Sequence, residues 1–243
     1  MVRLPNITFS GAPGEDPSPN NHAILSSLVT AHYTLPSLIA GGNVETQWLY
    51  VRKTNNFNSQ APVTDVTSND LRCYNSETHA TASTLTVSAG STIGFQANGP
   101  MYHQGFVNVY MAKAPGNVSQ WDGSGKVWFK VHEIPVATDG GNTITFPATN
   151  IQSFTFNLPS SLPSGQYLIR AEQVGLHSAS TFGGAQFFLS CGQLNVVNGG
   201  NGNPGPLVSI PGVYTGNEPG LLINIYWPIP ATWTQPGPSV WRG

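Results

Sequence analysis

One of the six histidines in this chain stands in a segment that could be released as a new N-terminus. The sequence Thr30-Ala31-His32-Tyr33 would, if cut after Ala31, free an α-amine beside the His32 imidazole. The amine and one ring nitrogen of the same residue can then chelate a metal ion through a six-membered ring, since neutral imidazole is a common metal ligand. As an ordinary internal residue, His32 has no evident chemical role.

A metal centre built on nitrogen ligands needs a second histidine that the fold brings to the first. Spacing alone selects none, because the sequence has no HxH, HExxH or CxxC motif. Of the other histidines, His79 in a polar turn and His132 beside Glu133 are predicted to be surface residues. His103 and His177 each lie next to a predicted strand. The histidines are His22, His32, His79, His103, His132 and His177.

Residues 1–31 resemble a leader only in part. Residues 23–31 are mostly apolar, with Val29 and Ala31 at the positions that a signal peptidase reads. Residues 13–21 are polar, acidic and rich in proline, unlike the basic start of a signal peptide. We interpret residues 1–31 as a signal peptide or an incorrectly assigned gene start that is removed, and residues 32–243 as one domain. Retention of residues 1–31 would displace the amine and leave an inactive protein.

The composition favours a neutral, hydroxylated partner. Charged residues make up only 8% of the chain, against about 25% in an average soluble protein. Nine lysines and arginines in no cluster argue against nucleic acid, which needs a run of cations. No stretch approaches the roughly 18 apolar residues of a membrane span. The composition therefore suits a polysaccharide ligand, although a secreted β protein with a low charge for no particular reason is the alternative.

Two further features indicate secretion. Cys73 and Cys191 are the two cysteines of the chain, and in a secreted protein an isolated pair most simply forms one disulfide. Asn117-Val118-Ser119 is a glycosylation sequon, so we expect Asn117 to carry a glycan. We therefore expect a secreted, extracellular protein.

The elements that must position the histidines are predicted to be short strands. From Tyr33 onward no segment keeps a helical apolar period over three turns, and 27 glycines and 20 prolines interrupt the chain. Turn signals between apolar runs predict an all-β fold, an immunoglobulin/fibronectin-III-like β-sandwich with long loops. Residues 210–241 are expected to be a long loop packed back on the sandwich. The predicted strands are 48–52, 83–87, 91–96, 105–111, 127–131, 153–158, 165–172 and 186–191.

Several segments, taken together and in order, resemble the fungal lytic polysaccharide monooxygenases of auxiliary activity family nine. Each segment alone would be a weak signal, but the similarity extends from His32 to Gly243. The segments are His32-Tyr33-Thr34-Leu35-Pro36, Pro62-Val63-Thr64-Asp65-Val66-Thr67-Ser68, Leu71-Arg72-Cys73-Tyr74, Tyr102-His103-Gln104-Gly105, Gly183-Gly184-Ala185-Gln186-Phe187 and Pro219-Gly220-Leu221-Leu222-Ile223-Asn224-Ile225-Tyr226.

The resemblance implies a copper site made by two histidines. His32 matches the N-terminal histidine that gives copper its amine and a ring nitrogen, and His103 matches the second histidine. Neutral nitrogen ligands suit copper(II), the strongest binder of the divalent series. His177 and Gln186 match the pair that positions the oxygen species by hydrogen bonding. Tyr226 matches a tyrosine of the flat face that binds the sugar chain, whereas Tyr214 and Trp233 are weaker candidates for that face.

One residue departs from the family pattern. The family usually has a tyrosine at the axial copper position, two residues after the glutamine, and here the residue is Phe188. The hydroxyl is therefore absent, and because axial groups tune copper potentials, altered redox behaviour is expected. The alternatives are that Phe188 only packs, or that the protein is a non-oxidative relative.

The resemblance predicts a secreted copper monooxygenase with one copper ion. It would cleave β-1,4-glucan, cellulose being favoured, by hydroxylating a glycosidic carbon, with C1 favoured, using O₂ or H₂O₂. An external electron donor, either a small reductant or a dehydrogenase, would be its partner, and we expect a monomer that binds neither nucleic acid nor membrane. The alternatives are a non-catalytic polysaccharide-binding or copper-binding protein of the same fold.

Overall fold

The structure is a computed structural model that describes residues 32–243. The predicted leader, residues 1–31, therefore lies outside the described residues. The elements are β1 (Ser37–Ala40), β2 (Asn43–Val44), α1 (Asp70–Cys73), β3 (Leu85–Ser88), β4 (Thr92–Gln96), β5 (Gly105–Lys113), the 3-10 turn η1 (Val118–Gln120), β6 (Lys126–Ile134), β7 (Ala137–Thr138), β8 (Ile144–Thr145), β9 (Ser153–Asn157), β10 (Gly165–Gly175), β11 (Gln186–Val197) and β12 (Val208–Ser209).

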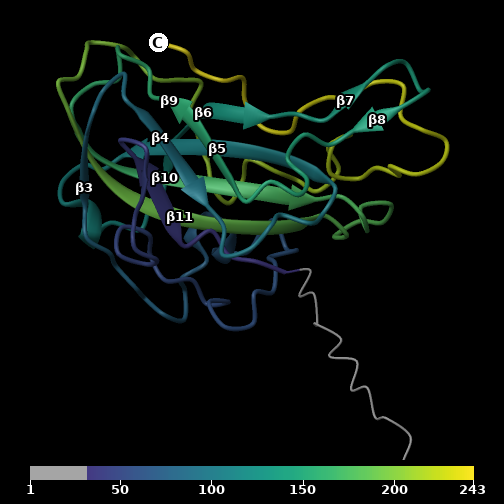
Figure 1. Ribbon diagram of the computed structural model, residues 1–243, viewed down its shortest axis with the longest axis horizontal. Coiled ribbons are helices and arrows are strands. Elements are labelled where there is room, and N and C mark those ends of the chain that lie inside the picture. The colour runs from purple at the N-terminus through teal and green to yellow at the C-terminus, as the bar shows by residue number, and fades with distance from the viewer. Residues whose placement is uncertain (1–31) are drawn as a thin grey trace, which may run out of the picture.

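Two sheets stack to form the predicted β-sandwich (Figure 1). The first sheet has the order β2-β1-β4-β9, and the second has the order β12-β6-β5-β10-β11-β3. All pairings in these sheets are antiparallel except that of β11 with β3. The small β7–β8 hairpin lies at one end of the molecule beside the C-terminal segment.

The six-stranded sheet is buried on both faces. Along β5, Val107, Val109 and Met111 enter the core between the two sheets. The alternate residues Phe106 and Tyr110 enter a second core on the opposite face. Because successive side chains of a strand point to opposite faces, burial on both faces explains the continuous apolar runs of these strands.

Loops and the C-terminal segment cover the outer face of this sheet. Leu221 and Ile225 belong to the second core, whereas Trp241 bonds through its backbone to Lys130 in β6 and packs against the core between the two sheets. The prediction that residues 210–241 form a long loop packed on the sandwich is thus confirmed, with the two-residue strand β12 (Val208–Ser209) just before it. Leu222, in contrast, is exposed.

Two predictions differ from the structure, namely the strand at residues 48–52 and the absence of any helix. Residues 48–52 form no strand, and only Val51 makes an isolated bridge to Gly192 of β11. Val51 is buried and Trp48 and Tyr50 are half-buried because this loop packs against the sandwich, whereas Leu49 is exposed. The chain also forms one helical turn, α1. None of the helices in residues 32–243 has the length and apolar character that crossing a membrane requires.

The disulfide predicted between Cys73 and Cys191 is present, with a sequence separation of 118. It joins the end of α1 to the middle of β11, and both cysteines are buried in the second core. The disulfide therefore fixes the long 48–84 region against the most extensively paired part of the sheet.

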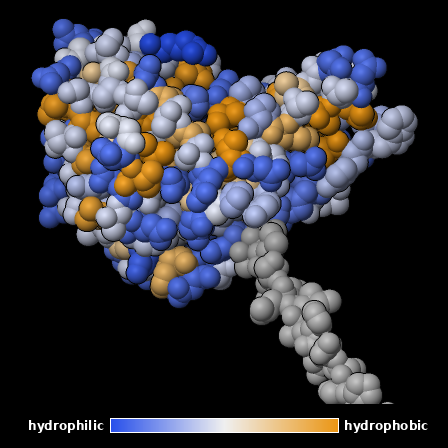
Figure 2. All heavy atoms as spheres, viewed as in Figure 1, coloured by the Kyte–Doolittle hydropathy of each residue, from blue (hydrophilic) through white to orange (hydrophobic). Residues whose placement is uncertain are grey.

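The visible surface in Figure 2 mixes hydrophilic and hydrophobic residues in small patches.

Candidate copper site

The ends of three neighbouring strands, β5, β10 and β11, lie side by side at one end of the six-stranded sheet. Gly175, the last residue of β10, lies opposite Gly105, the first residue of β5. On its other side it lies opposite Gln186, the first residue of β11. The loop before β5 carries His103 and the loop after β10 carries His177. The register of three antiparallel strands therefore gathers these side chains from distant parts of the sequence.

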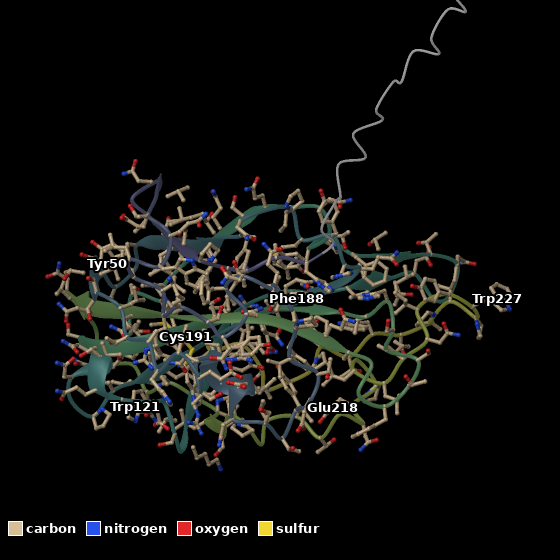
Figure 3. All side chains as sticks on the ribbon, turned by 90° about the horizontal axis from the view of Figure 1, so that it is seen from below. Tyr50, Trp121, Phe188, Cys191, Glu218 and Trp227 are labelled. Atoms are coloured by element: carbon tan, nitrogen blue, oxygen red, sulfur yellow. A yellow bond between two sulfur atoms is a disulfide. The ribbon has the colours of Figure 1, made fainter. Side chains whose placement is uncertain are left out.

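The structure brings the rings of His32, His103 and His177 together. The ring centroids of His32 and His103 are 5.7 Å apart, and those of His103 and His177 are 4.1 Å apart with nearly parallel planes. Phe188 lies beneath this group, with its ring centroid 5.2 Å from that of His103 and 5.7 Å from that of His32. Figure 3 shows Phe188 inside the molecule and Trp227 at its right-hand edge.

Backbone and side-chain bonds hold the segment that carries His32 against the loop that carries His103. The Thr34 amide donates to Asn98 Oδ1 at 2.9 Å, and the Asn98 amide donates to the Thr34 carbonyl at 3.1 Å. Further along the loop, Met101 is fully buried and exchanges two backbone bonds with residues 150 and 151. The position of one histidine relative to the other is thus fixed by several contacts.

Tyr33 and Gln173 add a buried connection that the sequence did not reveal. The Tyr33 hydroxyl donates to Gln173 Oε1, and Gln173 Nε2 donates to the His103 carbonyl at 2.9 Å. The Tyr33 ring also stacks on Phe188, with centroids 4.5 Å apart. The residue after His32 therefore helps to position His103. β10 also carries the polar residues Gln166, Arg170 and Glu172, so no feature of the sequence singled out Gln173.

Gly175 provides the space that His103 occupies. A Cβ built on Gly175 would lie 2.9 Å from His103 Cβ and 3.4 Å from His177 Nδ1. Real Cβ atoms essentially never approach another atom so closely, so any other residue here would displace a histidine. The absence of a side chain at position 175 is therefore a requirement of the site.

The environment keeps the rings of His103 and His177 neutral. Burial, and then the neighbouring His177 and His32, lower the pKa of His103 to about 4. Burial, and then His32, also lower the pKa of His177. An uncharged imidazole keeps the lone pair that a metal ion requires. Both rings can therefore act as ligands or hydrogen-bonding groups at neutral pH.

Several buried polar atoms at this site have no hydrogen-bond partner within residues 32–243. They are His103 Nε2, His177 Nδ1 and Gln186 Oε1. Buried polar atoms normally have partners, and orphaned ones point to an absent ion, water or ligand. No group of three or more His, Cys, Asp or Glu side chains in the described chain could hold a metal ion. A backbone amine beside the rings would supply the missing donor, and a nitrogen donor set of this kind fits copper.

The other predicted residues are placed as follows. Tyr226 is 57% exposed, and its hydroxyl donates to the His177 carbonyl at 3.1 Å, so it lies beside the site on the surface. Trp227, which the sequence analysis did not select, is 78% exposed. Tyr214 is buried and Trp233 packs on Phe106, so neither is part of an exposed face.

The other residues singled out from the sequence, His79, His132 and Asn117, do not belong to the histidine cluster. His79 is exposed as predicted, whereas His132, also predicted to be a surface residue, is half-buried. Its ring stacks on Phe156 with centroids 4.8 Å apart. Asn117 is exposed at the start of η1, and its Oδ1 accepts hydrogen bonds from the Ser119 amide and hydroxyl.

Comparison with known proteins decides the family. The model of Auxiliary Activity family 9, formerly GH61, matches residues 32–233 and begins at His32. The chain belongs to Auxiliary Activity family 9. It is 55% identical over 221 residues to AA9 family lytic polysaccharide monooxygenase H of Malbranchea cinnamomea, covering 90% of this chain and 96% of that protein. It is 52% identical to monooxygenase D of Phanerodontia chrysosporium, covering 91% and 97%.

Solved structures agree with this assignment. A cellulose-active polysaccharide monooxygenase from M. thermophila superposes with a TM-score of 0.73 at 28% identity, covering 87% of this chain and all of that one. The structure of HiLPMO9B gives a TM-score of 0.76 at the same identity and coverage. Family 9 proteins are generally secreted, use a single copper ion and cleave polysaccharides oxidatively with electrons from an external donor. The family assignment made from sequence segments is confirmed.

Proposed function

We propose that His32 and His103 hold the copper ion of this family 9 enzyme. Removal of residues 1–31 would give the site the α-amine and a ring nitrogen of His32, and His103 would supply a third nitrogen. The observation that carries the proposal is the buried Nε2 of His103, which has no partner within residues 32–243 and belongs to a ring 5.7 Å from that of His32. Neutral nitrogen donors are the set that copper(II) favours.

Bound copper supplies the one-electron chemistry that activates the oxygen co-substrate, either O₂ or H₂O₂. Around it, Gln186 Oε1 offers a hydrogen-bond acceptor and the neutral His177 ring offers a group that can donate or accept. Both side chains would orient the oxygen co-substrate and hold a proton near it, as groups around a metal commonly do. Phe188 closes the inner side with an apolar ring and keeps water away.

The proposed substrate is a β-1,4-glucan, with cellulose favoured and C1 as the favoured position of hydroxylation. The M. thermophila relative is described as cellulose-active. The exposed Tyr226 beside His177 supports this assignment, because an aromatic ring can lie on a sugar ring without any charge. A small reductant or a dehydrogenase would supply electrons, and the enzyme would act outside the cell as a monomer, glycosylated at Asn117.

A comparison of two N-termini tests the proposal. One protein begins at His32 and the other at Ala31, so they differ by one residue that moves the amine away. The first should bind one copper ion and release oxidised oligosaccharides from cellulose in the presence of reductant, as measured by calorimetry and mass spectrometry. The second should bind copper far more weakly and release none. Equal copper affinity in both proteins would refute the proposed ligand set.

A second candidate is a copper-binding or polysaccharide-binding protein of the same fold that does not oxidise. Phe188 is the observation that favours it, because the family's usual tyrosine hydroxyl is missing at this position. Tight copper binding by the protein that begins at His32, without reductant-dependent peroxide formation or oxidised sugars, would decide for this candidate.

A further inference from the structure

A polar cavity lies toward the other end of the six-stranded sheet from the cluster of His32, His103 and His177. It has a volume of about 360 Å³. Its lining includes Arg52, whose Nε bonds to Gln193 Oε1 at 2.9 Å. Gln193 is seven residues further along β11 than Gln186, which corresponds to roughly 23 Å along a strand. In Figure 3, Trp121 of this cavity and Phe188 lie on opposite sides of Cys191.

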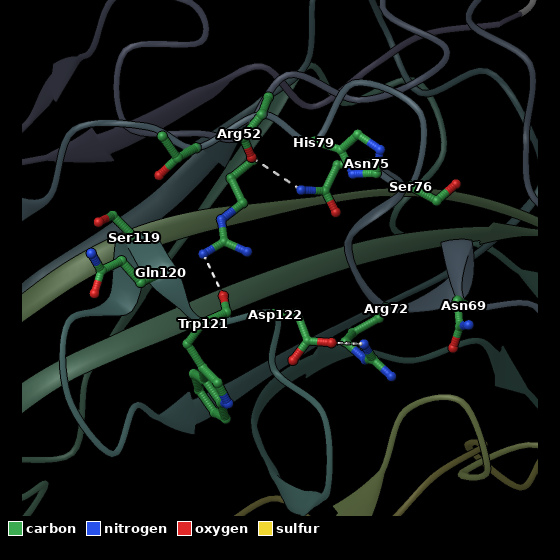
Figure 4. Close-up of a pocket in the computed structure, with 12 residues that line it drawn as sticks. Arg52, Asn69, Arg72, Asn75, Ser76, His79, Ser119, Gln120, Trp121 and Asp122 are labelled. Carbon is green, nitrogen blue, oxygen red and sulfur yellow. Dashed lines mark hydrogen bonds and ion pairs between the residues drawn. The ribbon is translucent and has the colours of Figure 1, made fainter.

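Arg52 is buried, but one nitrogen of its guanidinium makes no hydrogen bond to the described residues. The residue is 3% exposed, and its Nη2 donates to the carbonyls of Val118 and Trp121, each at 2.7 Å. Within residues 32–243 its Nη1 makes no hydrogen bond and Arg52 forms no ion pair. Arg52 lines the cavity, and Figure 4 shows its guanidinium held by the Trp121 carbonyl. Two donor hydrogens on Nη1 are therefore available to a ligand.

The charge of Arg52 is not balanced locally. Asp122 is the carboxylate of the cavity, and it pairs with Arg72 at 2.7 Å. Two guanidinium groups thus share one carboxylate, which leaves a net charge of about +1 when His79 is neutral. Burial lowers the pKa of Arg52 to about 10, and the charge of Asp122 opposes that shift, so Arg52 stays protonated at neutral pH. A bound monoanion would compensate this net positive charge and accept hydrogen bonds from Arg52 Nη1, which lies in the lining of the cavity.

The rest of the lining suits hydroxyl groups. Neutral amide and hydroxyl side chains surround the opening, namely Asn69, Asn75, Ser76, Ser119 and Gln120. Asp122 disfavours a dianion such as phosphate, because the excess charge would face a carboxylate. A volume of about 360 Å³ lies in the range of small-molecule sites. The guanidinium of Arg52 that is left after Arg72 pairs with Asp122, together with the neutral hydrogen-bonding groups, matches a ligand with one carboxylate and several hydroxyls.

We propose that this cavity binds a sugar acid, with its carboxylate on Arg52 Nη1 and its hydroxyls on the polar rim. Such a group occurs as a uronic acid unit of an acidic hemicellulose and as the aldonic acid end of an oxidised glucan. In either case the ligand would hold the protein to carbohydrate about a strand length from the histidines. The cavity would thus be a second, anion-selective carbohydrate site.

Binding to the whole folded protein, with its copper, tests the assignment. The probes are sodium D-glucuronate, sodium D-gluconate, D-glucose and inorganic phosphate, titrated at constant ionic strength and followed by calorimetry and amide NMR. Saturable binding of glucuronate or gluconate, with shifts at residues 118–122 and none for glucose, is the expected result. Preference between the two acids identifies the source. Equal binding of glucose, tighter binding of phosphate, or no saturation with either acid would overturn the proposal.

Variants separate the site from general charge effects. Gln120 is exposed on the rim and its side chain makes no hydrogen bond within the described residues, so Gln120→Glu adds a negative charge without disturbing the fold. It should weaken binding of the acid at least about fivefold, since a like charge opposes the carboxylate. Gln47→Glu, an exposed substitution outside the cavity, should leave binding unchanged. Equal weakening by both variants would show that net charge alone is responsible.

Discussion

Gly175, at the end of β10, lies against His103 in the loop that precedes the neighbouring strand β5, because a Cβ at position 175 would lie 2.9 Å from His103 Cβ. Gly175→Ala should therefore displace His103 and weaken copper binding by at least about tenfold, or roughly 1.4 kcal/mol. Calorimetry on the protein that begins at His32 measures this change. Gly116→Ala is the matched control, since nothing lies within 4 Å of its added Cβ. Unchanged affinity in Gly175→Ala would contradict the packing argument.

Phe188 gives a redox prediction. Phe188→Tyr would add an oxygen atom to a ring 5.2 Å from that of His103. Because oxygen donors favour copper(II) over copper(I), the midpoint potential should fall by roughly 30–60 mV, about a threefold to tenfold change in relative affinity. Spectroelectrochemistry measures the potential, and electron paramagnetic resonance reports any new ligand.

Phe187→Tyr provides the control for this change. Phe187 precedes Phe188 on β11 and enters the core on the opposite face of the sheet. Its hydroxyl cannot reach the histidines, so the potential should stay at the value of the unmodified protein. An equal fall in both variants would indicate a general loss of packing instead of a local effect of the hydroxyl.

The disulfide gives a stability prediction. Cys73 and Cys191 are separated by 118 residues, and the chain-entropy relation assigns about 5 kcal/mol to a loop of this length. The double variant Cys73→Ala/Cys191→Ala should lose up to this amount of unfolding free energy in denaturant titration. Reduction of the original protein should produce a similar loss, whereas a change below about 1 kcal/mol would refute the estimate.

His132 makes the stability depend on pH. Burial lowers its pKa below the usual 6.5, while Glu133 raises it and Arg242 lowers it further. The unfolded chain therefore binds a proton more readily than the folded one, so stability falls as the pH drops below 6.5. His132→Phe keeps an aromatic ring beside Phe156 and removes the titration. Its unfolding free energy, measured without metal, should vary less between pH 7 and 5 than that of the original protein.

The sheet was predictable where apolar runs are long and lie between turn signals. β5, β10 and β11 follow from such runs because each is buried on both faces. Residues 48–52 carry the same pattern, yet they form one isolated bridge at Val51, since burial by a packed loop leaves the same sequence signature as a strand. Local sequence cannot separate these cases.

The site was predictable only through resemblance. His32, His103 and His177 follow no spacing rule, and the contact between Tyr33 and Gln173 joins residues 140 positions apart. Such pairs depend on strand register, which is set by the whole sheet. The polar character of Gln173 was visible in the sequence, but its partner was not.

The register at Gly175, opposite both Gly105 and Gln186, also bears on how such a protein can change over time. The loop between residues 176 and 185 can gain or lose residues without moving the strands that it joins. Deletion of one residue within β10 or β11 would instead turn alternate side chains to the opposite face, exchanging the places of Phe187 and Phe188. Variation in length is therefore compatible with the histidine cluster in the part of this loop that follows His177, and incompatible with it inside these two strands.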